Sequence, residues 1–252
     1  GQGKFFIVEG DEYEEKFRRF RPVGIVIPSL DYDHPDYFKT RENYLNSFES
    51  WLRENQQAKI VRDFEEVDER IFEKTNFLLP GKHYRRNCLL AIRLARLFGI
   101  ETDKIIQGIN SFRGVRRRLD FYTPEDSEIL IVYDYAHHPV EIQATLDALS
   151  EKYPGRPLVA VFQPHTFSRT AAFLDEFAKS FSKAEMVFFE KIYASARETK
   201  GAVGLAELIQ RTKKYHKKAA SFEDFNLAVL PANPLIIFMG AGDMDQKVRK
   251  FL

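Results

Sequence analysis

The side chains best suited to chemistry gather in two short segments of the chain. Residues 134–139 read Asp-Tyr-Ala-His-His-Pro and directly follow the apolar run 129–133. Residues 162–170 read Phe-Gln-Pro-His-Thr-Phe-Ser-Arg-Thr and follow the apolar run 158–161. Both segments place polar side chains at the carboxyl end of a predicted strand, just before a predicted helix. Ligands bind at that edge of open α/β sheets, so we expect these segments to form the functional face of the chain.

The histidine and arginine side chains of these segments indicate what that chemistry would be. His137 and His138 change charge near neutral pH, so they suit acid–base catalysis or phosphate binding. A histidine pair in a loop is, however, more often exposed or caps a helix. His165 and Arg169 occupy the corresponding place after the next strand. A guanidinium can bind a carboxylate through two parallel hydrogen bonds, as recognition of an amino acid would require.

The first part of the chain carries carboxylates after two other apolar runs. Glu-Gly-Asp-Glu at 9–12 follows the run 5–8, and the acidic segment 31–36 follows the run 24–27. We expect both runs to form buried strands, and side chains at neighbouring strand ends can converge on one divalent metal ion. Oxygen ligands of this kind suit Mg²⁺. The alternative is that both segments are acidic surface loops.

Two further segments have more than one interpretation. Residues 113–118 include four arginines, and they either hold phosphates between domains or form a solvated linker. Gly-Ala-Gly-Asp at 240–243 follows the apolar run 235–238. A single Gly-x-Gly is common, so a plain tight turn is the better interpretation there than a phosphate-binding turn.

The second half of the chain alternates β-rich runs with helical patterns. Predicted strands are 128–134, 158–163, 186–190 and 235–239, with a weaker one at 218–221, and predicted helices are 139–152, 168–182 and 204–214, with a short one at 222–229. Phe173, Phe177 and Phe181 recur at four-residue spacing, which is typical of a buried helical stripe. This alternation predicts an α/β fold with a doubly wound, mostly parallel, Rossmann-like sheet over about 119–252.

The first part of the chain is less regular. It predicts amphipathic helices at 42–54 and 84–98, and a connection between domains at 108–118. We therefore expect a partial α/β domain of the nucleotide-binding type over 1–112, a hinge at 113–118 and a C-terminal domain over 119–252.

Composition limits the class of protein. Of 252 residues, 44% are hydrophobic and 30% are charged, as in an ordinary globular protein. The net charge of +1 argues against electrostatic capture of nucleic acid. The single cysteine, Cys88, fits a reducing compartment, and no apolar run is long enough to cross a membrane. We expect a cytoplasmic protein without membrane insertion, and the sequence leaves the oligomeric state open.

Taken in order, these segments resemble the Mur ligases of cell-wall precursor synthesis over nearly the whole chain. Each motif is short, but their number and order make the combination specific. The matching segments are 8–13, 33–34, 79–83 with Asn87, 114–118, 134–139, 162–165 and 240–243. The resemblance implies a ligase that uses ATP to convert a carboxylate into an acyl phosphate, which an amine then attacks. Segment 162–165 favours the branch of the family that adds L-alanine to UDP-N-acetylmuramate.

The resemblance also implies where the metal and the nucleotide would bind. Two anions must meet in such a reaction, so a metal ion and cationic side chains must neutralise their charge. Mg²⁺ would lie at Glu9 and His34, and the adenine would lie near Asn87. Arg118 and Asp134 would contact the nucleotide, with Arg118 at the phosphates.

The amino-acid end of the site follows from the same resemblance. Tyr135, His137, His165 and Arg169 would receive the amino acid or the reacting phosphate. The catalytic residues would be His34, Arg118 and His137. The C-terminal domain would close over the central domain about the hinge at 113–118.

The chain departs from the family pattern in several ways. The domain for the UDP-sugar and the glycine-rich phosphate loop belong upstream of Glu9, where only eight residues stand, and the stretch 52–78 is short. We therefore expect a fragment, an incomplete form or a reduced relative that does not hydrolyse ATP alone. Thr166 stands where the alanine-adding branch usually has arginine, and Tyr84 replaces a usual asparagine.

These departures leave two alternatives to an alanine-adding ligase. Segment 8–13 is closer to the branch of the family that recycles the cell-wall tripeptide. The chain could also be a noncatalytic binding module that kept the ligase fold.

Overall fold

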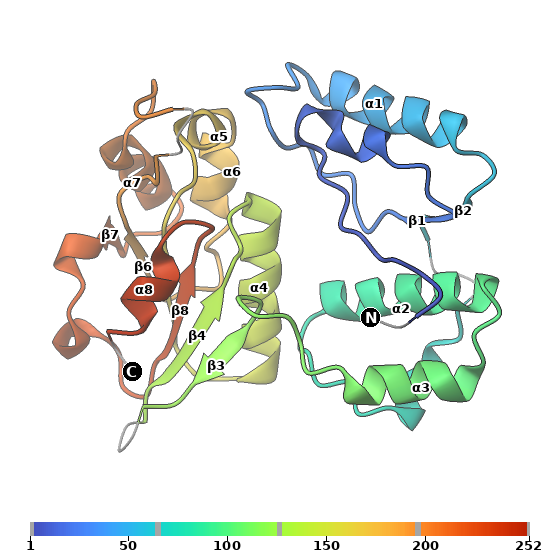
Figure 1. Cartoon of the computed structure of the whole chain (residues 1–252). Helices are drawn as coiled ribbons and strands as arrows, with labels where there is room; N and C mark the ends of the chain where they lie inside the picture. Colours follow the sequence, from blue (N-terminus) through green and yellow to red (C-terminus); the bar gives the residue numbers. More distant parts are fainter. Residues whose placement is uncertain (1–2, 64–66, 125–127, 195–197, 251–252) are drawn as a thin grey trace. The chain divides into compact units, whose positions relative to one another are not determined.

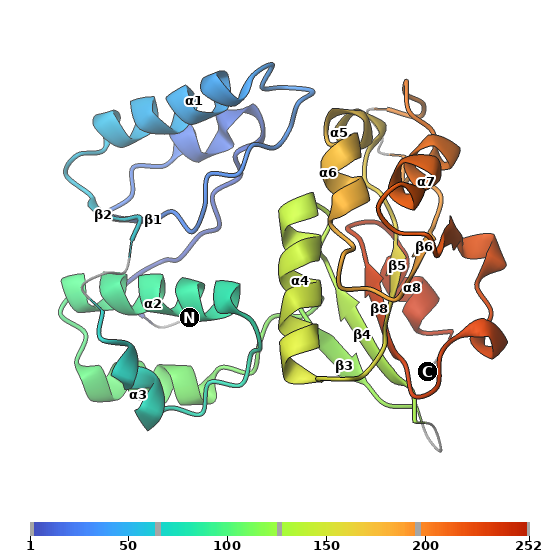
Figure 2. The same ribbon diagram turned by 180° about the vertical axis from the view of Figure 1, so that it is seen from behind.

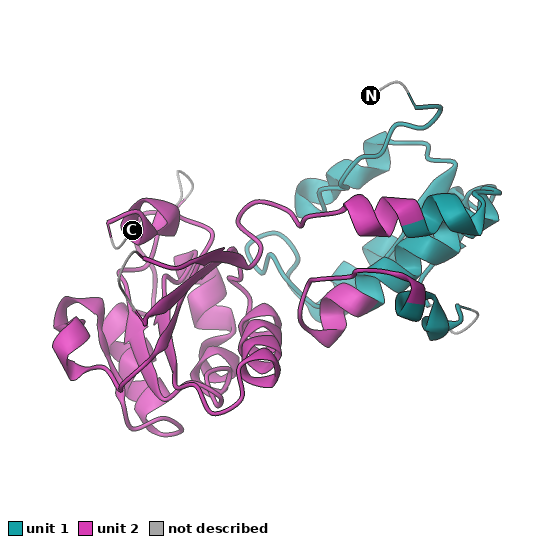
Figure 3. Cartoon of the chain, turned by 90° about the horizontal axis from the view of Figure 1, so that it is seen from below, with its two compact units in different colours: residues 1–73, 86–106 teal, residues 74–85, 107–252 magenta. Residues whose placement is uncertain are grey.

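The computed structural model describes residues 3–63, 67–124, 128–194 and 198–250 (Figure 1). The chain divides into two compact units, coloured separately in Figure 3. Unit 1 comprises residues 1–73 and 86–106, and unit 2 comprises residues 74–85 and 107–252. Within the described ranges, every helix is too short or too polar to cross a lipid bilayer.

Unit 1 combines a small parallel sheet with helices. Strands β1 and β2 pair in parallel, with Ile25 opposite Ile60. The elements in chain order are η1 (Tyr13–Arg19), β1 (Gly24–Val26), α1 (Arg41–Glu54), β2 (Lys59–Val61), η2 (Glu69–Lys74), α2 (Lys82–Leu97) and α3 (Thr102–Ser111), of which η2, α2 and α3 also contribute residues to unit 2.

Local sequence explains helix α1. The Thr40 side chain accepts a hydrogen bond from the backbone N–H of Asn43 and so caps the helix. Trp51 and Leu52 of α1 are buried with Phe17 and Ile25 in the core of unit 1. The predicted helices 42–54 and 84–98 therefore correspond to α1 and α2.

The predicted strand at 5–8 is wrong. These residues form no strand, and the side chains of Phe6 and Ile7 are 91% and 92% exposed. A strand needs a neighbour that pairs with its backbone N–H and C=O groups. Among the described residues of unit 1, only β1 and β2 pair with each other, so the apolar run 5–8 has no place in this sheet.

Unit 2 contains a six-stranded sheet in the order β3-β4-β8-β5-β6-β7. All neighbours are parallel except β3 and β4, which are antiparallel. The elements are β3 (Asp120–Tyr122), β4 (Leu130–Asp134), α4 (Pro139–Lys152), β5 (Leu158–Phe162), α5 (Phe167–Ala172), α6 (Leu174–Lys179), β6 (Met186–Phe189), α7 (Leu205–Lys213), β7 (Ala219–Ser221), η3 (Phe222–Asp224), η4 (Leu227–Val229), β8 (Leu235–Met239) and α8 (Met244–Val248). The predicted α/β fold with a mostly parallel sheet is confirmed.

Helices cover both faces of this sheet, as Figures 1 and 2 show for α8 on one face and α4 on the other. Successive side chains of β5 point to opposite faces of the sheet. Val159 and Val161 join a buried cluster that includes Met244 of α8. Phe162 instead contacts Phe177 and Phe181, with ring centroids 5.5 Å and 5.6 Å apart.

The predicted helix 168–182 consists of two shorter helices. Phe173 has φ −116° and ψ 28°, and it ends α5 and begins α6. The phenylalanine stripe is nevertheless buried, as predicted, because Phe173, Phe177 and Phe181 are 9%, 0% and 0% exposed. The break places the Phe173 ring 4.9 Å from the ring of His138.

The strand order brings three loops together at one edge of the sheet. Asp134 of β4 and Phe162 of β5 both lie opposite Met239 of the intervening β8. The segments that follow these three strands therefore start side by side at the carboxyl edge. They are 135–138, 163–166 and 240–243, all of which the sequence analysis selected.

Candidate active site

Asp134 lies at the centre of the carboxyl edge and is 2% exposed. One carboxylate oxygen accepts the backbone N–H of Leu119 at 3.1 Å, and the other accepts that of Ala136 at 2.8 Å. Burial raises the pKa of this carboxyl to about 6, although the two N–H groups and Arg118 favour its charged form. Asp134 thus joins the 117–119 segment to the end of β4.

Arg118 and His137 both contact the carboxylate of Glu141. Arg118 Nη1 lies 3.2 Å from Glu141 Oε1. Glu141 Oε2 accepts the backbone N–H groups of His137 at 3.0 Å and His138 at 3.2 Å, and it lies 3.4 Å from His137 Nδ1. Burial raises the pKa of Glu141, but the charges of His137 and Arg118 outweigh burial, so the pKa lies below its usual value.

Glu141 is a residue that the sequence analysis did not select. It forms a capping box with His138 at the start of α4. The spacing of a capping residue followed three positions later by glutamate is a visible sequence signal, although the capping residue here is histidine rather than serine or threonine. That signal predicts a helix start and does not predict the contact with Arg118.

Arg117 connects the 113–118 segment to the end of β4 and to the 240–243 turn. Its Nε donates to the Tyr133 hydroxyl at 2.9 Å, and its Nη2 donates to the Gly242 carbonyl at 3.1 Å. The guanidinium carbon also lies 4.6 Å from the Tyr135 ring centroid, and that of Arg118 lies 5.3 Å from the same ring. Two cationic groups on one aromatic ring make this part of the edge suited to an anion.

His165 and Arg169 lie on the segment that follows β5. The His165 ring stacks on Tyr193 at 5.4 Å and meets the His137 ring edge-on at 6.2 Å. Arg169 is 5% exposed, and its Nη1 donates to the His165 carbonyl at 2.8 Å. The structure thus brings His137, His165 and Arg169 together, and it adds Tyr193, which has no motif around it in the sequence.

Glu198 holds the start of the helix that carries Arg169. Its carboxylate accepts the Ser168 backbone N–H at 3.0 Å and the Ser168 hydroxyl at 2.8 Å. Burial raises the pKa of Glu198. Hydrogen bonds from Thr166 and Ser168 and the charge of His165 lower it by a larger amount, so the pKa lies below its usual value. No local sequence pattern indicates this contact, which joins residues 30 positions apart.

The 240–243 segment forms a turn that packs on Gln163. The Gln163 amide and Asp243 exchange two hydrogen bonds, at 2.7 Å and 3.2 Å. Gly240 has φ +151°, a conformation that side chains rarely adopt. A Cβ on Gly242 would lie 2.6 Å from Tyr193 and would also strike Gln163 Oε1, so only glycine fits there.

His83 and Tyr84 belong to unit 2 and lie on the first turn of α2. Burial and the charge of Arg118 lower the pKa of His83. Burial and the charge of Asp134 raise the pKa of Tyr84. Asn87, the residue expected near the adenine, lies on the same helix about one turn later and is exposed, in the part of the chain assigned to unit 1.

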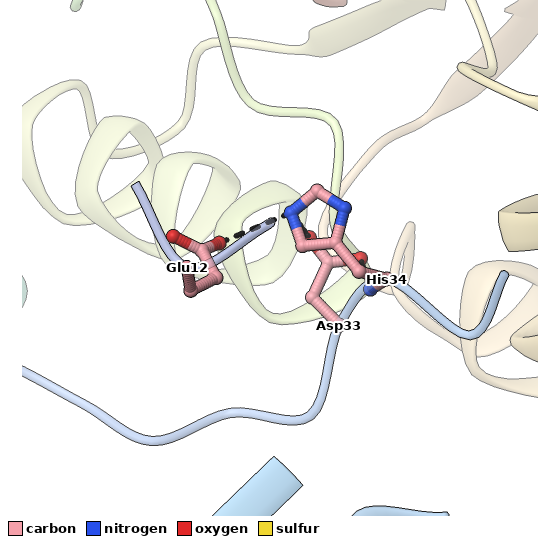
Figure 4. A group of neighbouring side chains, drawn as sticks. All are labelled: Glu12, Asp33 and His34. Carbon is pink, nitrogen blue, oxygen red and sulfur yellow. Dashed lines mark hydrogen bonds and ion pairs between the residues drawn. The ribbon is translucent and has the colours of Figure 1, made fainter. Parts of the chain in front are cut away.

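Unit 1 contains a separate group of possible metal ligands, shown in Figure 4. Glu12, Asp33 and His34 each offer one atom, and these atoms lie within 4.8 Å of one another. His34 Nε2 lies 3.1 Å from Glu12 Oε1 and 3.9 Å from Asp33 Oδ2. The group contains His34, as the sequence analysis expected, but Glu12 and Asp33 take part in it, whereas Glu9 is exposed and outside it.

This donor set fits a divalent cation. Two carboxylates supply the hard oxygen atoms that Mg²⁺ prefers, and a neutral imidazole can add a nitrogen. The three side chains are only partly buried, so water molecules could complete the coordination that Mg²⁺ requires.

Comparison with known proteins identifies the class to which this fold and edge belong. Residues 117–242 match the family model described as Mur ligase, glutamate ligase domain. The match covers half of the chain and includes residues 135–138, 163–166 and 240–242 of the carboxyl edge of unit 2. The chain therefore belongs to the Mur ligase family.

The curated relatives extend the likeness over nearly the whole chain. UDP-N-acetylmuramate–L-alanine ligase of Streptococcus agalactiae serotype Ia is 33% identical over 287 residues, which cover 98% of this chain and 64% of the relative. The chain thus spans less than two thirds of that relative's length. Because the aligned region is longer than this 252-residue chain, the relative has residues there without a counterpart here.

Solved structures support the fold. The UDP-N-acetylmuramate–alanine ligase of Thermotoga maritima has a TM-score of 0.67 at 21% identity, covering 93% of this chain and 60% of that chain. MurF of Acinetobacter baumannii has a TM-score of 0.69 at 11% identity, covering 94% of this chain and 61% of that chain. At these identities the likeness concerns the fold alone.

Proposed function

We propose that the protein containing this chain is an ATP-dependent ligase of peptidoglycan precursor synthesis that adds L-alanine to UDP-N-acetylmuramate. The observation that carries the proposal is the joint position of Arg118, His137 and His165 at the carboxyl edge of the family-matching sheet. The name of the curated relative supplies the two substrates. A cytoplasmic location is part of the same proposal.

The proposed reaction has two steps. A carboxylate oxygen of UDP-N-acetylmuramate attacks the γ-phosphorus of ATP, which gives an acyl phosphate and ADP. The amine of L-alanine then attacks the acyl carbon, inorganic phosphate leaves, and an amide forms as the nitrogen loses a proton. Both steps bring anionic groups together, so cationic side chains are required.

The nucleotide end of the edge fits the first step. Arg118 would neutralise phosphate charge, since its guanidinium lies beside the Tyr135 ring and pairs with only one carboxylate oxygen of Glu141. Asp134 would fix the segment that carries Arg118 and contact the nucleotide, and Asn87 would lie near the adenine. Mg²⁺ would be held by His34 with Glu9 as the resemblance implies, or with Glu12 and Asp33, and would neutralise phosphate charge when bound.

The part of the edge around His137 and His165 fits the second step. The His137 and His165 rings lie edge to face, so an amino acid bound there would contact two imidazoles. We assign the acceptance of the amine proton to His137 and the recognition of the carboxylate to His165, Arg169 and Tyr135. Residues 113–118 would be the hinge between a partial central domain at 1–112 and the C-terminal domain at 119–252.

Phosphate release by the full-length gene product tests this function. We expect release only when ATP, Mg²⁺, UDP-N-acetylmuramate and L-alanine are all present. Arg118→Ala should reduce release at least about a hundredfold, as loss of one stabilising group does in other enzymes. Arg249→Ala is the matched control, because Arg249 is exposed directly after the end of α8 and its loss should leave the rate within about twofold.

Other outcomes would favour the alternatives. Activity with a peptide but not with L-alanine would identify a tripeptide-recycling ligase. Calorimetric binding of nucleotide or amino acid without phosphate release would identify a noncatalytic binding module.

A further inference from the structure

One carboxylate touches both the residue assigned to the phosphates and the residue assigned to the amine. Glu141 Oε1 lies 3.2 Å from Arg118, and Oε2 lies 3.4 Å from the His137 imidazole. We propose that Glu141 is a positioning residue that couples Arg118 to His137. This inference rests on the proposed function, in which these two side chains serve the two halves of the reaction.

The backbone fixes Glu141 in place. Its Oε2 accepts the N–H groups of His137 and His138 at 3.0 Å and 3.2 Å, which closes the capping box of α4. The carboxylate therefore belongs to a helix start, where unpaired N–H groups and the helix dipole favour a negative charge. A side chain anchored in this way can hold other groups at a fixed position.

Glu141 and the Tyr135 carbonyl together select the form of the His137 imidazole. Nδ1 lies 3.0 Å from the Tyr135 carbonyl oxygen and 3.4 Å from Glu141 Oε2. Both partners accept hydrogen bonds, so a neutral imidazole carries its proton on Nδ1. The lone pair is then on Nε2, which is the form needed to accept a proton from an attacking amine.

Arg118 depends on the same carboxylate. Its guanidinium lies between Glu141 and the Tyr135 ring, whose centroid is 5.3 Å from the guanidinium carbon. The ring alone would allow the guanidinium to slide over its face. The ion pair with Glu141 sets the direction of the fork, so a change at Glu141 is transmitted to Arg118 and His137 together.

A glutamine at position 141 separates this role from simple helix capping. Its carbonyl oxygen can still accept the two backbone N–H groups, so the cap remains. Its NH₂ group donates and cannot pair with a guanidinium. Glu141→Gln should therefore keep the fold and lose the link between Arg118 and His137.

A set of mutant cycles in the full-length enzyme tests the coupling. We would measure kcat/KM for L-alanine in Arg118→Lys, in His137→Asn and in the double variant, with Glu141 present and again with Glu141→Gln. Residues that share a partner deviate from additivity. We expect the double variant to deviate at least about fivefold when Glu141 is present, and less than about twofold when it is replaced.

Stability and a matched control complete the experiment. Glu141→Gln should keep the melting temperature within about 3 °C, whereas Glu141→Ala, which loses the cap, should lower it further. Glu151→Gln is the control, because Glu151 lies at the other end of α4 and its ion pair with Lys82 is exposed. The cycles should be unchanged in that background.

Two results would overturn the inference while the proposed function stands. Cycles that are additive with Glu141 present, in an active enzyme, would show that Glu141 does not couple the two residues. Coupling of the same size in the Glu141→Gln background would assign Glu141 to capping alone. An enzyme without ligase activity would overturn the proposed function and this inference with it.

Discussion

The Glu198 carboxylate binds Ser168 twice, through the backbone N–H at 3.0 Å and the hydroxyl at 2.8 Å. Ser168 is the second residue of α5, where backbone N–H groups have no partner within the helix. A residue 30 positions away thus completes the start of this helix. Because α5 carries Arg169, the position of that arginine depends on Glu198.

We expect Glu198→Ala to weaken amino-acid binding more than nucleotide binding. Loss of the carboxylate leaves the start of α5 without its partner, so Arg169 and His165 shift. The KM for L-alanine should rise at least about tenfold, and the KM for ATP should change less than about twofold. Steady-state kinetics of the full-length enzyme would measure both values. Glu207→Ala on the exposed surface of α7 is the control, and equal effects on both KM values would contradict this account.

The raised pKa of Asp134 predicts a specific pH dependence of stability. The pKa is about 6 in the folded protein and 3.8 is its ordinary value. At a pH between these two values the carboxyl is ionised in the unfolded chain but protonated in the folded protein. A rise in pH across this range therefore lowers the free energy of unfolding. The protonated carboxyl contributes about 3 kcal/mol to the free energy of unfolding. This contribution is fully present below about pH 4 and is lost above about pH 6.

Comparison with Asp134→Asn isolates this effect, because asparagine does not titrate there. The free energy of unfolding in urea would be measured for both proteins from pH 4 to pH 7. The free energy of unfolding of the wild type minus that of the variant should fall as the pH rises towards 6 and then stay constant. A difference that grows with pH would show that the pKa of Asp134 is lowered rather than raised.

Gly242→Ala should damage the turn that supports the edge. The added methyl group would meet Gln163 Oε1 and Tyr193, whose ring stacks on His165. We expect a loss of about 2 kcal/mol in unfolding free energy, as overpacking typically gives. Gly108→Ala is the control, since a Cβ there meets no atom of the described structure within 4 Å and alanine favours the helix α3, so this variant should not lose stability. Equal stability of the two variants would contradict the close approach at Gly242.

Titration with Mg²⁺ would show which of the carboxylates, Glu12 or Glu9, is a metal ligand. Glu12→Gln removes the negative charge of one of the three converging ligands, so the Mg²⁺ concentration for half-maximal activity should rise at least about tenfold. Glu42→Gln on the exposed start of α1 is the control and should not change it. Glu9→Gln tests the ligand that the family resemblance implies, and wild-type behaviour of that variant would remove Glu9 from the site. An unchanged Mg²⁺ dependence in Glu12→Gln would contradict a site at Glu12, Asp33 and His34.

Local patterns predicted most of unit 2. Helix 139–152 and strand 235–239 have the predicted bounds, because a Pro at the helix start and a short apolar run are local signals. The antiparallel strand β3 was not predicted, since its pairing with β4 depends on a neighbour and leaves little trace in three residues. The run 5–8 shows the converse, because apolar residues form a strand only where a pairing partner exists.

The candidate site was only partly visible in the sequence. The segments 134–139 and 162–170 carry their polar residues at strand ends, which sequence periodicity locates. Glu198 and Tyr193 reach the edge through tertiary contacts and have no motif around them. Their contribution required the fold, and so did the contact of Glu141 with Arg118.

The identity of the product tests the central claim most directly. The full-length protein would be incubated with ATP, Mg²⁺, UDP-N-acetylmuramate and equal concentrations of L-alanine and the cell-wall tripeptide, and the products would be separated by mass spectrometry. We predict a single new species, UDP-N-acetylmuramate joined to L-alanine by an amide bond, formed in equal amount with ADP and phosphate. A tripeptide adduct as the main product, or ADP formed without any amide, would contradict the account.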